Sequence, residues 1–287
     1  MPAPTYSLEP VAQAICAASG HKFGGGINQG TFKETFLATK TDGTKLALKV
    51  LRQGCSTERS DREVDAMKRC DHPNIIALLE LADFVHASTK YTYLLEKFME
   101  GGTLDDRLKG GLLNRKDVLA LGDELIRAVV HIAEKDLVHR DFKPANILYA
   151  APGGEAMVGD FGIVRDLRKE SLTKSYLLQG PGTPFFASPE QLNNEKALID
   201  WRTDQFAIGV TLAIAHFGVH PYREDGESDG QAVGRVALRT GPCAKFIHTS
   251  SVAKLPVIHK MVARWPAERF RLPNTLLEEW RKQMEGA

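Results

Sequence analysis

The sequence of 287 residues has little excess charge of either sign, few cysteines and no long hydrophobic run. Its 37 lysines and arginines nearly balance its 36 aspartates and glutamates, and a formal net charge of +1 gives no global field for nucleic acid or for an anionic membrane. None of the four cysteines lies in a CxxC pair or in a His/Cys cluster with zinc spacing. We therefore expect reduced thiols, no zinc site and no nucleic-acid partner.

The hydrophobic runs are too short for a membrane protein. The longest, residues 206–219, contains His216 and cannot span a bilayer. Near the N-terminus, the apolar stretch Val11–Ala18 follows Glu9 and not the basic residues that open a signal peptide. We expect a cytoplasmic protein without membrane contact, and the sequence leaves its oligomeric state open.

The order of secondary-structure signals predicts an α+β protein. Strand-like segments at 24–50 surround a hairpin turn at Asp42-Gly43, and a further strand is expected at 91–98. Helices are predicted mostly later in the chain, at 61–70, 114–135, 204–217 and 276–284. Strands early and helices late indicate a small β-rich lobe followed by a larger α-rich lobe. The expected parts are an extension or accessory helix at 1–20, the small lobe at 21–98 and the large lobe at 99–287, with the polar stretch 223–230 as a surface loop.

Three motifs in the second half carry the chemistry: HRDFKPANIL at 139–148, DFG at 160–162 and GTPFFASPE at 182–190. Each tripeptide alone is a weak signal, because HRD can be a surface loop and DFG a turn, but the three in this order are specific. Phosphoryl transfer depends on positioning and charge neutralisation. Asp141 can orient an incoming hydroxyl, and Lys143 can neutralise the transferred phosphoryl group. Asn146 and Asp160 supply the hard oxygen ligands that magnesium prefers.

With these motifs, the chain resembles the eukaryotic-like serine/threonine protein kinases, the kind also found in bacteria, from about residue 22 to about 273. The resemblance implies the two-lobed protein-kinase fold and transfer of the γ-phosphoryl group of ATP to proteins. It also implies Mg²⁺ as the cofactor ion, with Mn²⁺ as a second candidate. The identity of the protein substrates does not follow from it.

The segment LALK at 46–49 resembles the family's VAIK strand, so Lys49 would hold the ATP phosphates. Its expected partner is Glu63, on the following helix. Glu63 could instead close an S-x-x-E capping box with Ser60. Glu58 is a competing partner for Lys49, but its spacing from Glu63 directs it to another side of a helix.

The glycine-rich loop is the weakest match to the family. In the segment INQGTFKETFLA at 27–38, Gly30 is kept, while Asn28 and Lys33 stand at the other two glycine positions and Thr35 replaces a valine. Glycine allows close approach of the backbone to phosphate, and asparagine tolerates positive φ better than most residues. The triplet Gly24–Gly26 is an alternative loop, although the strand after it would then begin too late.

The segment LLEKFMEGG at 94–102 resembles the hinge of the family. The backbone of Lys97 and Met99 would meet the adenine edge. The apolar walls expected around the base are Ile27, Ala47 and Leu148.

Glu96 falls at the back-pocket position of this segment, where the family usually has an apolar residue or threonine. A partly buried carboxylate there needs a partner. Either the register is shifted by one residue, or Glu96 is paired, and Lys49 is one candidate for that ion pair.

Residues 160–190 resemble an activation segment, which favours a protein kinase over a small-molecule kinase. Glu190 is expected to pair with Arg269, and Asp204 to brace the catalytic loop; these roles are structural.

Candidate phosphorylation sites in this segment are Thr173 and Ser175, with Ser171 next, and their phosphates would dock on Arg140. The alternative is that they are ordinary loop hydroxyls. Lys143 and Thr183 resemble the serine/threonine branch, and Ile163 favours threonine acceptors.

Two other functions fit part of the pattern. A pseudokinase would lack Lys49, Asp141, Asn146 or Asp160, and only the degenerate glycine loop favours it. A small-molecule kinase would lack the Pro-Glu anchor at 189–190. A docking role for the polar stretch 223–251 is compatible with kinase activity.

Overall fold

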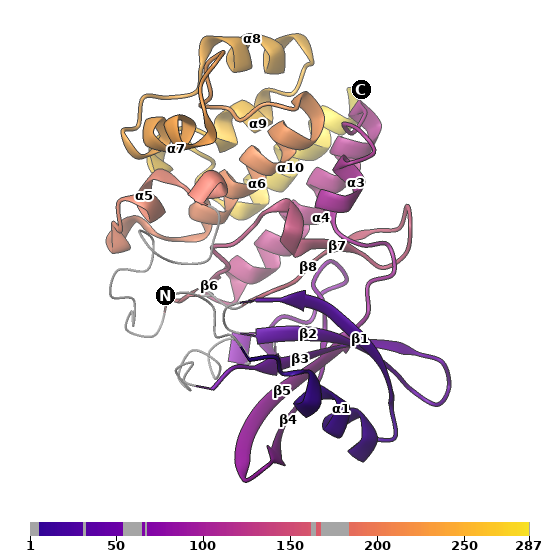
Figure 1. Cartoon of the computed structure of the whole chain (residues 1–287). Helices are drawn as coiled ribbons and strands as arrows, with labels where there is room; N and C mark the ends of the chain where they lie inside the picture. Colours follow the sequence, from indigo (N-terminus) through magenta and orange to yellow (C-terminus); the bar gives the residue numbers. More distant parts are fainter. Residues whose placement is uncertain are drawn as a thin grey trace. The chain divides into compact units, whose positions relative to one another are not determined.

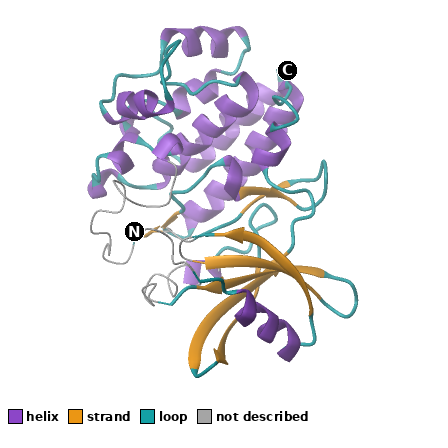
Figure 2. Ribbon diagram, viewed as in Figure 1, coloured by secondary structure: helices purple, strands orange, loops and turns teal. Residues whose placement is uncertain are grey.

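The computed structural model describes residues 6–30, 33–53, 65, 66, 68–161, 165–167 and 184–286. The chain divides into two compact units, one of residues 1–71 and 76–100 and the other of residues 72–75 and 101–287. The first unit consists mainly of strands and the second mainly of helices (Figures 1 and 2). The predicted α+β fold class, with a β-rich lobe followed by an α-rich lobe, is confirmed.

The first unit contains an antiparallel five-stranded sheet with the strand order β1-β2-β3-β5-β4. Its strands are β1 Lys22–Gln29, β2 Lys33–Thr39, β3 Lys45–Leu51, β4 Leu78–His86 and β5 Thr89–Lys97. The predicted Asp42-Gly43 turn joins β2 to β3. Gly43 has φ +87°, a conformation that glycine adopts readily, and the Thr44 N–H donates to Asp42 Oδ1 at 2.8 Å.

Helix α1, Glu9–Ala18, packs on one face of this sheet. Strand alternation explains the contact, because every second residue of β2 and β3 points to the same side. The helix and sheet form one apolar core from Leu8, Val11, Ala12, Ile15, Cys16, Phe36, Ala38, Leu46, Leu48, Val50, Tyr93 and Leu95. Of the two expectations for residues 1–20, the structure has the accessory helix. The intervening residues, among them Thr35, Ala47 and Lys49, belong to the other face of the sheet and are half-buried.

The segment before α1 is tied to the turn between β1 and β2 by Arg52. This buried guanidinium forms an ion pair with the equally buried Glu34, and it donates to the carbonyl oxygens of Gly30 at 3.1 Å and Tyr6 at 2.8 Å. The Leu8 N–H donates to Glu34 at 3.1 Å. Because buried charges require partners, these contacts fix Arg52 and Glu34 to each other and to both segments.

The second unit is built around long helices. Its helices are α3 Leu104–Leu108, α4 Arg115–Glu134, α5 Pro189–Leu192, α6 Trp201–Phe217, α7 Asp229–Ala237, α8 Ala244–Val252, α9 Pro256–Met261 and α10 Pro273–Glu285. Short strands form two pairs: β6 Leu137–Val138 with β9 Arg165–Asp166, and β7 Ile147–Tyr149 with β8 Ala156–Val158. Single 3-10 turns lie at Pro144–Asn146, Pro184–Phe186, Lys196–Leu198 and Pro266–Glu268.

Helix α4 is the packing partner of both α6 and α10. Asn114 caps it as predicted, accepting the Asp117 N–H at 2.9 Å. Trp280 of α10 is fully buried, and its indole N–H donates to the Leu119 carbonyl at 3.0 Å. A Cβ at Gly122 would lie 1.9 Å from the Trp280 ring, so this close approach of α10 to α4 requires glycine.

Several helix boundaries differ from the prediction. Helix α6 begins at Trp201, not at 204, because the Asp200 side chain accepts the Arg202 N–H and caps it there. Helix α10 begins at Pro273, with proline in its first turn. Helices α3, α5, α7, α8 and α9 had no counterpart in the prediction. Of the helix expected at 61–70, the structure describes only residues 65, 66, 68 and 69, which are helical, and residue 70.

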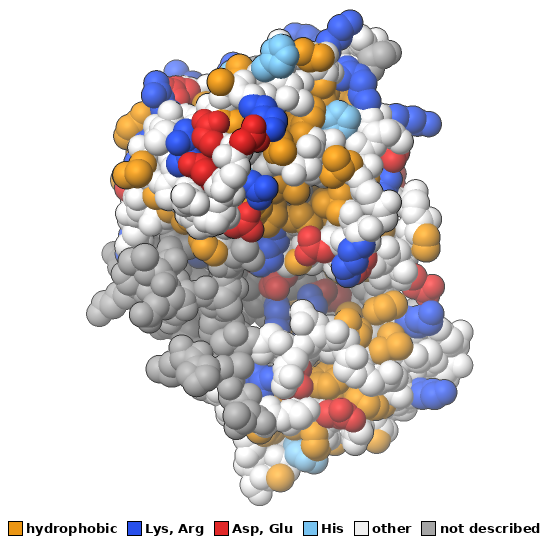
Figure 3. All heavy atoms as spheres, turned by 45° about the horizontal axis from the view of Figure 1, so that its top comes forward, with side chains coloured by type: hydrophobic (Ala, Val, Ile, Leu, Met, Phe, Trp, Pro, Cys, Tyr) orange, Lys and Arg blue, Asp and Glu red, His pale blue; other side chains and the backbone are white. Residues whose placement is uncertain are grey.

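The stretch 223–230 is a loop until Ser228, whose capping box with Gln231 starts α7. Acidic and basic side chains lie close together in this stretch and in the helices that follow it, and Figure 3 shows such neighbouring charges on one face of the second unit. The ion pairs there are Arg223–Asp229, Arg235–Glu224, Arg235–Glu227 and Lys245–Asp225. Such mutual pairing leaves little excess charge of one sign on this region.

Candidate active site

The predicted catalytic loop, residues 139–146, runs from the end of β6 to the start of β7 in the second unit. The 3-10 turn Pro144–Asn146 completes it, and Pro144 restricts the backbone at the first position of that turn. Arg140 has φ +69°, an unusual conformation for a non-glycine residue. The Gln191 side chain donates to the Arg140 carbonyl at 3.0 Å, which supports this bend.

Three of the predicted site residues, Asp141, Lys143 and Asn146, contact one another. Lys143 Nζ lies 3.0 and 2.9 Å from the two carboxylate oxygens of Asp141. Asn146 Nδ2 donates to Asp141 Oδ2 at 2.7 Å and to the Asp141 carbonyl at 2.9 Å. Burial raises the pKa of Asp141, and the attraction of Lys143 opposes that rise. The carboxylate is therefore held in one orientation while its side chain stays 17% exposed.

Asp204 of α6 braces the loop from within the second unit. Its two oxygens accept the backbone N–H groups of His139 and Arg140, each at 2.7 Å. The side chain is fully buried, and this burial raises the pKa of Asp204 to about 7, against the effect of the two backbone donors. Because the contacts go to the main chain, Asp204 fixes the path of the loop immediately before Asp141.

His139, the first residue of the loop, has a fully buried side chain. Its Nδ1 accepts the Asp141 N–H at 3.2 Å, so Nε2 carries the proton and donates to the Gly159 carbonyl at 3.1 Å. Its ring contacts Phe142 and Phe161, with centroids 4.9 and 4.8 Å apart. Burial lowers the pKa of His139 to about 4.

This buried histidine gives an expected pH dependence of stability. Between pH 6.5 and about 4 the unfolded chain binds a proton at His139 that the folded chain does not, so folded stability falls as the pH falls through this window. We expect the loss to be about 3 kcal/mol. To measure it, the unfolding free energies of wild type and His139→Gln are determined at pH 7 and at pH 4. The expected result is that the advantage of wild type over the variant shrinks by this amount as the pH falls.

Asp204 titrates in the opposite sense, since its pKa is raised, but it is present in both proteins and cancels in that difference. The prediction is contradicted if the difference in unfolding free energy between wild type and His139→Gln stays constant from pH 7 to pH 4.

The two predicted metal ligands, Asn146 and Asp160, supply oxygen donors. Because Asn146 directs its Nδ2 to Asp141, its Oδ1 is the atom left to face an ion. Asp160 has φ +61° and follows Gly159, whose N–H donates to the Asn146 carbonyl at 3.0 Å. Over the described residues, no group of three or more His, Cys, Asp or Glu side chains could hold a metal by itself. Two oxygen donors completed by phosphate and water fit Mg²⁺.

Glu190 and Arg269 form a fully buried ion pair. Arg269 Nη1 and Nη2 lie 2.7 and 3.1 Å from the two Glu190 oxygens, and neither side chain is exposed. Thr203 Oγ1 donates to Glu190 at 3.0 Å, and Arg269 also donates to the carbonyls of Ala263 and Arg202. This network attaches the start of α5 to the turn before α10.

In the first unit, Lys49 pairs with Glu96. Lys49 Nζ lies 2.7 Å from Glu96 Oε1 and 2.6 Å from Oε2. Of the two alternatives for Glu96, the paired carboxylate is the one found. Glu63, the partner expected from the family resemblance, lies outside the described residues, as do Glu58 and Ser60.

The remaining nucleotide-binding candidates of the first unit lie on or next to its strands. Gly24–Gly26 lie within β1, while the Gly30 N–H donates to the Lys33 carbonyl at 2.9 Å across the turn between β1 and β2. Asn28 pairs with Thr35 in the register of these strands. Their exposure varies: Asn28, Ile27 and Lys97 are exposed, Gly30, Thr35 and Ala47 half-buried, and Met99 buried. Leu148, in β7 of the second unit, is half-buried.

The candidate phosphorylation sites Thr173 and Ser175 lie outside the described residues, as do Ser171, Ile163 and Thr183.

The sequence did not predict two supporting side chains of the site. Gln191 donates to the Arg140 carbonyl, and Arg52 donates to the Gly30 carbonyl. Gln191 follows directly after the Pro-Glu pair, a position that marks it for attention. Nothing in the sequence pairs Arg52 with Glu34.

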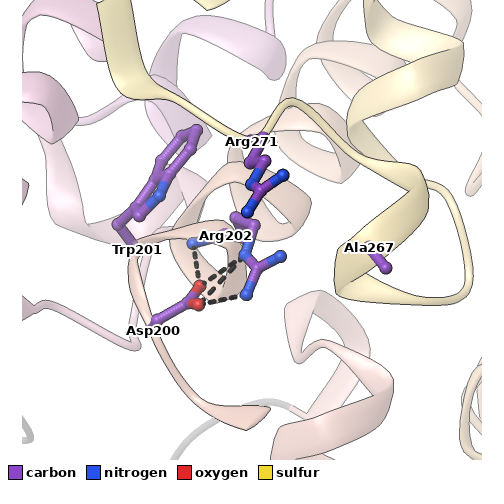
Figure 4. A pocket seen from close by; sticks show the side chains of 5 residues that line it. All are labelled: Asp200, Trp201, Arg202, Ala267 and Arg271. Carbon is purple, nitrogen blue, oxygen red and sulfur yellow. Dashed lines mark hydrogen bonds and ion pairs between the residues drawn. The ribbon is translucent and has the colours of Figure 1, made fainter.

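A surface pocket of about 450 Å³ lies elsewhere in the second unit, lined by Asp200, Trp201, Arg202, Ala267 and Arg271 (Figure 4). It contains none of the predicted site residues. The Asp200 carboxylate engages the Arg202 guanidinium, with Nε 3.0 Å from each oxygen, and Arg202 Nη1 donates to the Pro266 carbonyl. These contacts stabilise the start of α6.

No helix in the described part of the chain combines the length and apolar character needed to cross a bilayer. Cys16, Cys70 and Cys243 are buried thiols, not disulfides.

Comparison with known proteins shows the family of the chain. Residues 22–281 match the family model of the protein kinase domain. Among curated proteins, the chain is 29% identical to the calcium/calmodulin-dependent protein kinase type 1B of Rattus norvegicus, over 88% of this chain and 73% of that protein. It is 30% identical to the MAP kinase-activated protein kinase 2 of Drosophila melanogaster, over 82% and 65%. With the probable serine/threonine-protein kinase MARK-C of Dictyostelium discoideum it shares 28% identity, over 93% and 34%. The resemblance drawn from the motifs is confirmed, and the chain belongs to the protein kinase family.

Proposed function

We propose that this protein kinase transfers the γ-phosphoryl group of ATP to serine and threonine hydroxyls of proteins, with Asp141 as the residue that orients the acceptor. The observation that carries the proposal is the arrangement at Asp141, where Lys143 and Asn146 bind the carboxylate and Asp204 fixes the preceding backbone. A fixed, partly exposed carboxylate beside a lysine ammonium is suited to accept a hydroxyl proton while the lysine neutralises charge on the phosphoryl group.

Each further residue has a defined task in this proposal. Asn146 and Asp160 hold Mg²⁺ through oxygen atoms, and the ion neutralises charge on the phosphates when it is bound. Lys49 binds the ATP phosphates through its ammonium group. The backbone of Lys97 and Met99 meets the adenine edge, and apolar side chains flank the base.

Autophosphorylation belongs to the same proposal. Thr173 and Ser175 are the acceptors, and Arg140 receives the phosphate. The support is the position of Arg140 directly before Asp141, together with the strong, bidentate pairing of arginine with phosphate.

The test is phosphate incorporation by the purified chain. Wild type and Asp160→Asn are incubated with labelled ATP, Mg²⁺ and a generic protein substrate, and the products are resolved into phosphoserine, phosphothreonine and phosphotyrosine. We expect label on serine and threonine, none with EDTA, recovery on adding excess Mg²⁺, and at least about a 10²-fold loss in Asp160→Asn, as for other charge-stabilising groups. Peptide mapping of the chain itself locates any autophosphorylation.

Two outcomes contradict the proposal. ATP binding without transfer, with Mg²⁺ and with Mn²⁺, would identify a nucleotide-binding module. Transfer only to small molecules, with no labelled protein, would identify a small-molecule kinase. Thermal unfolding with and without Mg-ATP separates the first outcome from a misfolded preparation, since a ligand that binds the folded state stabilises it.

A further inference from the structure

The ion pair between Lys49 and Glu96 lies within a single sheet. Both carboxylate oxygens of Glu96 are within 2.7 Å of Lys49 Nζ, and the side chains of Lys49 and Glu96 are only 12% and 3% exposed. Lys49, which the proposed function requires as a cation, is thus already paired with a carboxylate of its own unit.

Sheet register explains why these two residues meet. Lys49 of β3 lies opposite Leu94 of β5, and Ala47 lies opposite Glu96. Lys49 and Glu96 are therefore diagonal neighbours on the same face, a separation that a lysine side chain can cross. The main-chain ladder between β3 and β5 fixes this placement.

Burial makes the two charges depend on each other. A carboxylate as buried as Glu96 is strongly unfavourable without a cation. Lys49 supplies that cation, and its ammonium has three N–H donors, of which the two oxygens of Glu96 take at most two. At least one donor then remains for a phosphate oxygen, so Glu96 can orient Lys49 without exhausting it.

We propose that Glu96 is the positioning residue that orients Lys49 toward the phosphates of ATP, the task that the family resemblance assigns to Glu63. This inference rests on the proposed function, in which Lys49 binds those phosphates. Because Lys49 and Glu96 belong to adjacent strands, the orientation of Lys49 is set once the sheet forms and requires no rearrangement of another element.

The test compares three single variants by kcat, by KM for ATP and by the Kd for Mg-ATP from calorimetry. Glu96→Gln keeps the shape and removes the charge, and we expect kcat/KM for ATP to fall about 10²-fold, as for small misplacements of a catalytic group. Glu96→Asp keeps the charge but shortens the side chain, and it is expected to recover about tenfold of that loss, which leaves kcat/KM about tenfold below that of wild type. The loss of kcat/KM for ATP in Glu63→Gln is expected to be smaller than the loss in Glu96→Gln, by a factor of at least about ten.

A matched control is Glu80→Gln on the neighbouring strand β4. The Glu80 carboxylate accepts the Tyr93 hydroxyl at 2.6 Å on the same sheet, and this change is expected to leave kcat/KM within about threefold of wild type. Thermal unfolding of every variant reports whether the sheet is intact.

A double variant separates positioning from a general structural role. If Glu96 acts through Lys49, adding Glu96→Gln to Lys49→Met weakens Mg-ATP binding by no more than about threefold beyond Lys49→Met alone. Independent, multiplied losses overturn the proposal, as does a severe loss in Glu63→Gln with near-normal kinetics in Glu96→Gln. If Glu96→Gln does not fold, Glu96→Asp decides, because its kcat/KM must fall while its melting temperature stays near that of wild type.

These readouts distinguish the two proposals. If wild type transfers no phosphate, the proposed function fails, and the Kd for Mg-ATP still decides whether Glu96 and Lys49 act as one unit. If wild type is active and only the Glu96 variants behave like the Glu80 control, the positioning role alone fails.

Discussion

Asp141→Asn is expected to lower kcat by about 10²- to 10⁴-fold, the range that a positioned general base contributes. Asparagine has the same shape and can still accept one hydrogen bond from Lys143, but it cannot take a proton from a hydroxyl. Since Asp141 is not expected to bind the nucleotide, the Kd for Mg-ATP should remain within about threefold of wild type, so that the loss appears in the chemical step. Single-turnover kinetics with saturating ATP measures it.

The matched control for this change is Asp136→Asn. Asp136 precedes the catalytic loop and has φ +57°, a conformation that asparagine accepts as well as aspartate. Its carbonyl accepts the Leu167 N–H, a backbone contact that the substitution keeps. A variant at Asp141 that turns over within about tenfold of wild type, while Asp136→Asn is normal, would remove Asp141 from the role of base.

The general architecture could be predicted because local signals and the global fold agree. The hairpin at Asp42-Gly43, the Asn114 cap and the apolar repeat of α4 each indicate one structure, and each is found. The missed helices, α3, α5 and α7 to α9, are short. Helix α7 did carry a signal, the capping box of Ser228 and Gln231, in a stretch whose polar composition suggested a loop.

The partners of buried charges could not be predicted in the same way. Whether Glu96 meets Lys49 depends on which residue of β5 lies opposite Ala47, and a shift of one residue would turn Glu96 to the other face. The sequence could only state the alternatives. Likewise, Arg52 meets Glu34 because the register of β2 and β3 places Glu34 opposite Val50, two residues before Arg52, and no local motif states that register. The catalytic roles of the predicted site residues remain predictions that the kinetic experiments address.

Replacing Arg269 with alanine is expected to reduce the free energy of unfolding by about 3–5 kcal/mol, the cost of leaving one charge of a buried pair without its partner. Glu190 would retain the Thr203 hydroxyl as a donor, although it would remain fully buried. The carbonyls of Ala263 and Arg202 would lose their guanidinium donor, and the contact of Arg269 with the Phe206 ring, 4.9 Å from its centroid, would also be lost. Because whole domains are stable by only about 5–15 kcal/mol, this loss should be evident in urea unfolding.

The control for Arg269 is Arg281→Ala, which breaks an ion pair with Asp123 whose arginine side chain is 52% exposed. Exposed pairs contribute at most about 1 kcal/mol, so the two arginine variants should differ severalfold. Removing both buried charges, in Glu190→Leu with Arg269→Met, should recover part of the stability, since apolar residues of similar volume can replace a buried pair. A loss below about 1 kcal/mol in Arg269→Ala would mean that water or another donor reaches Glu190. The pair would then contribute little to attaching α5 to the turn before α10.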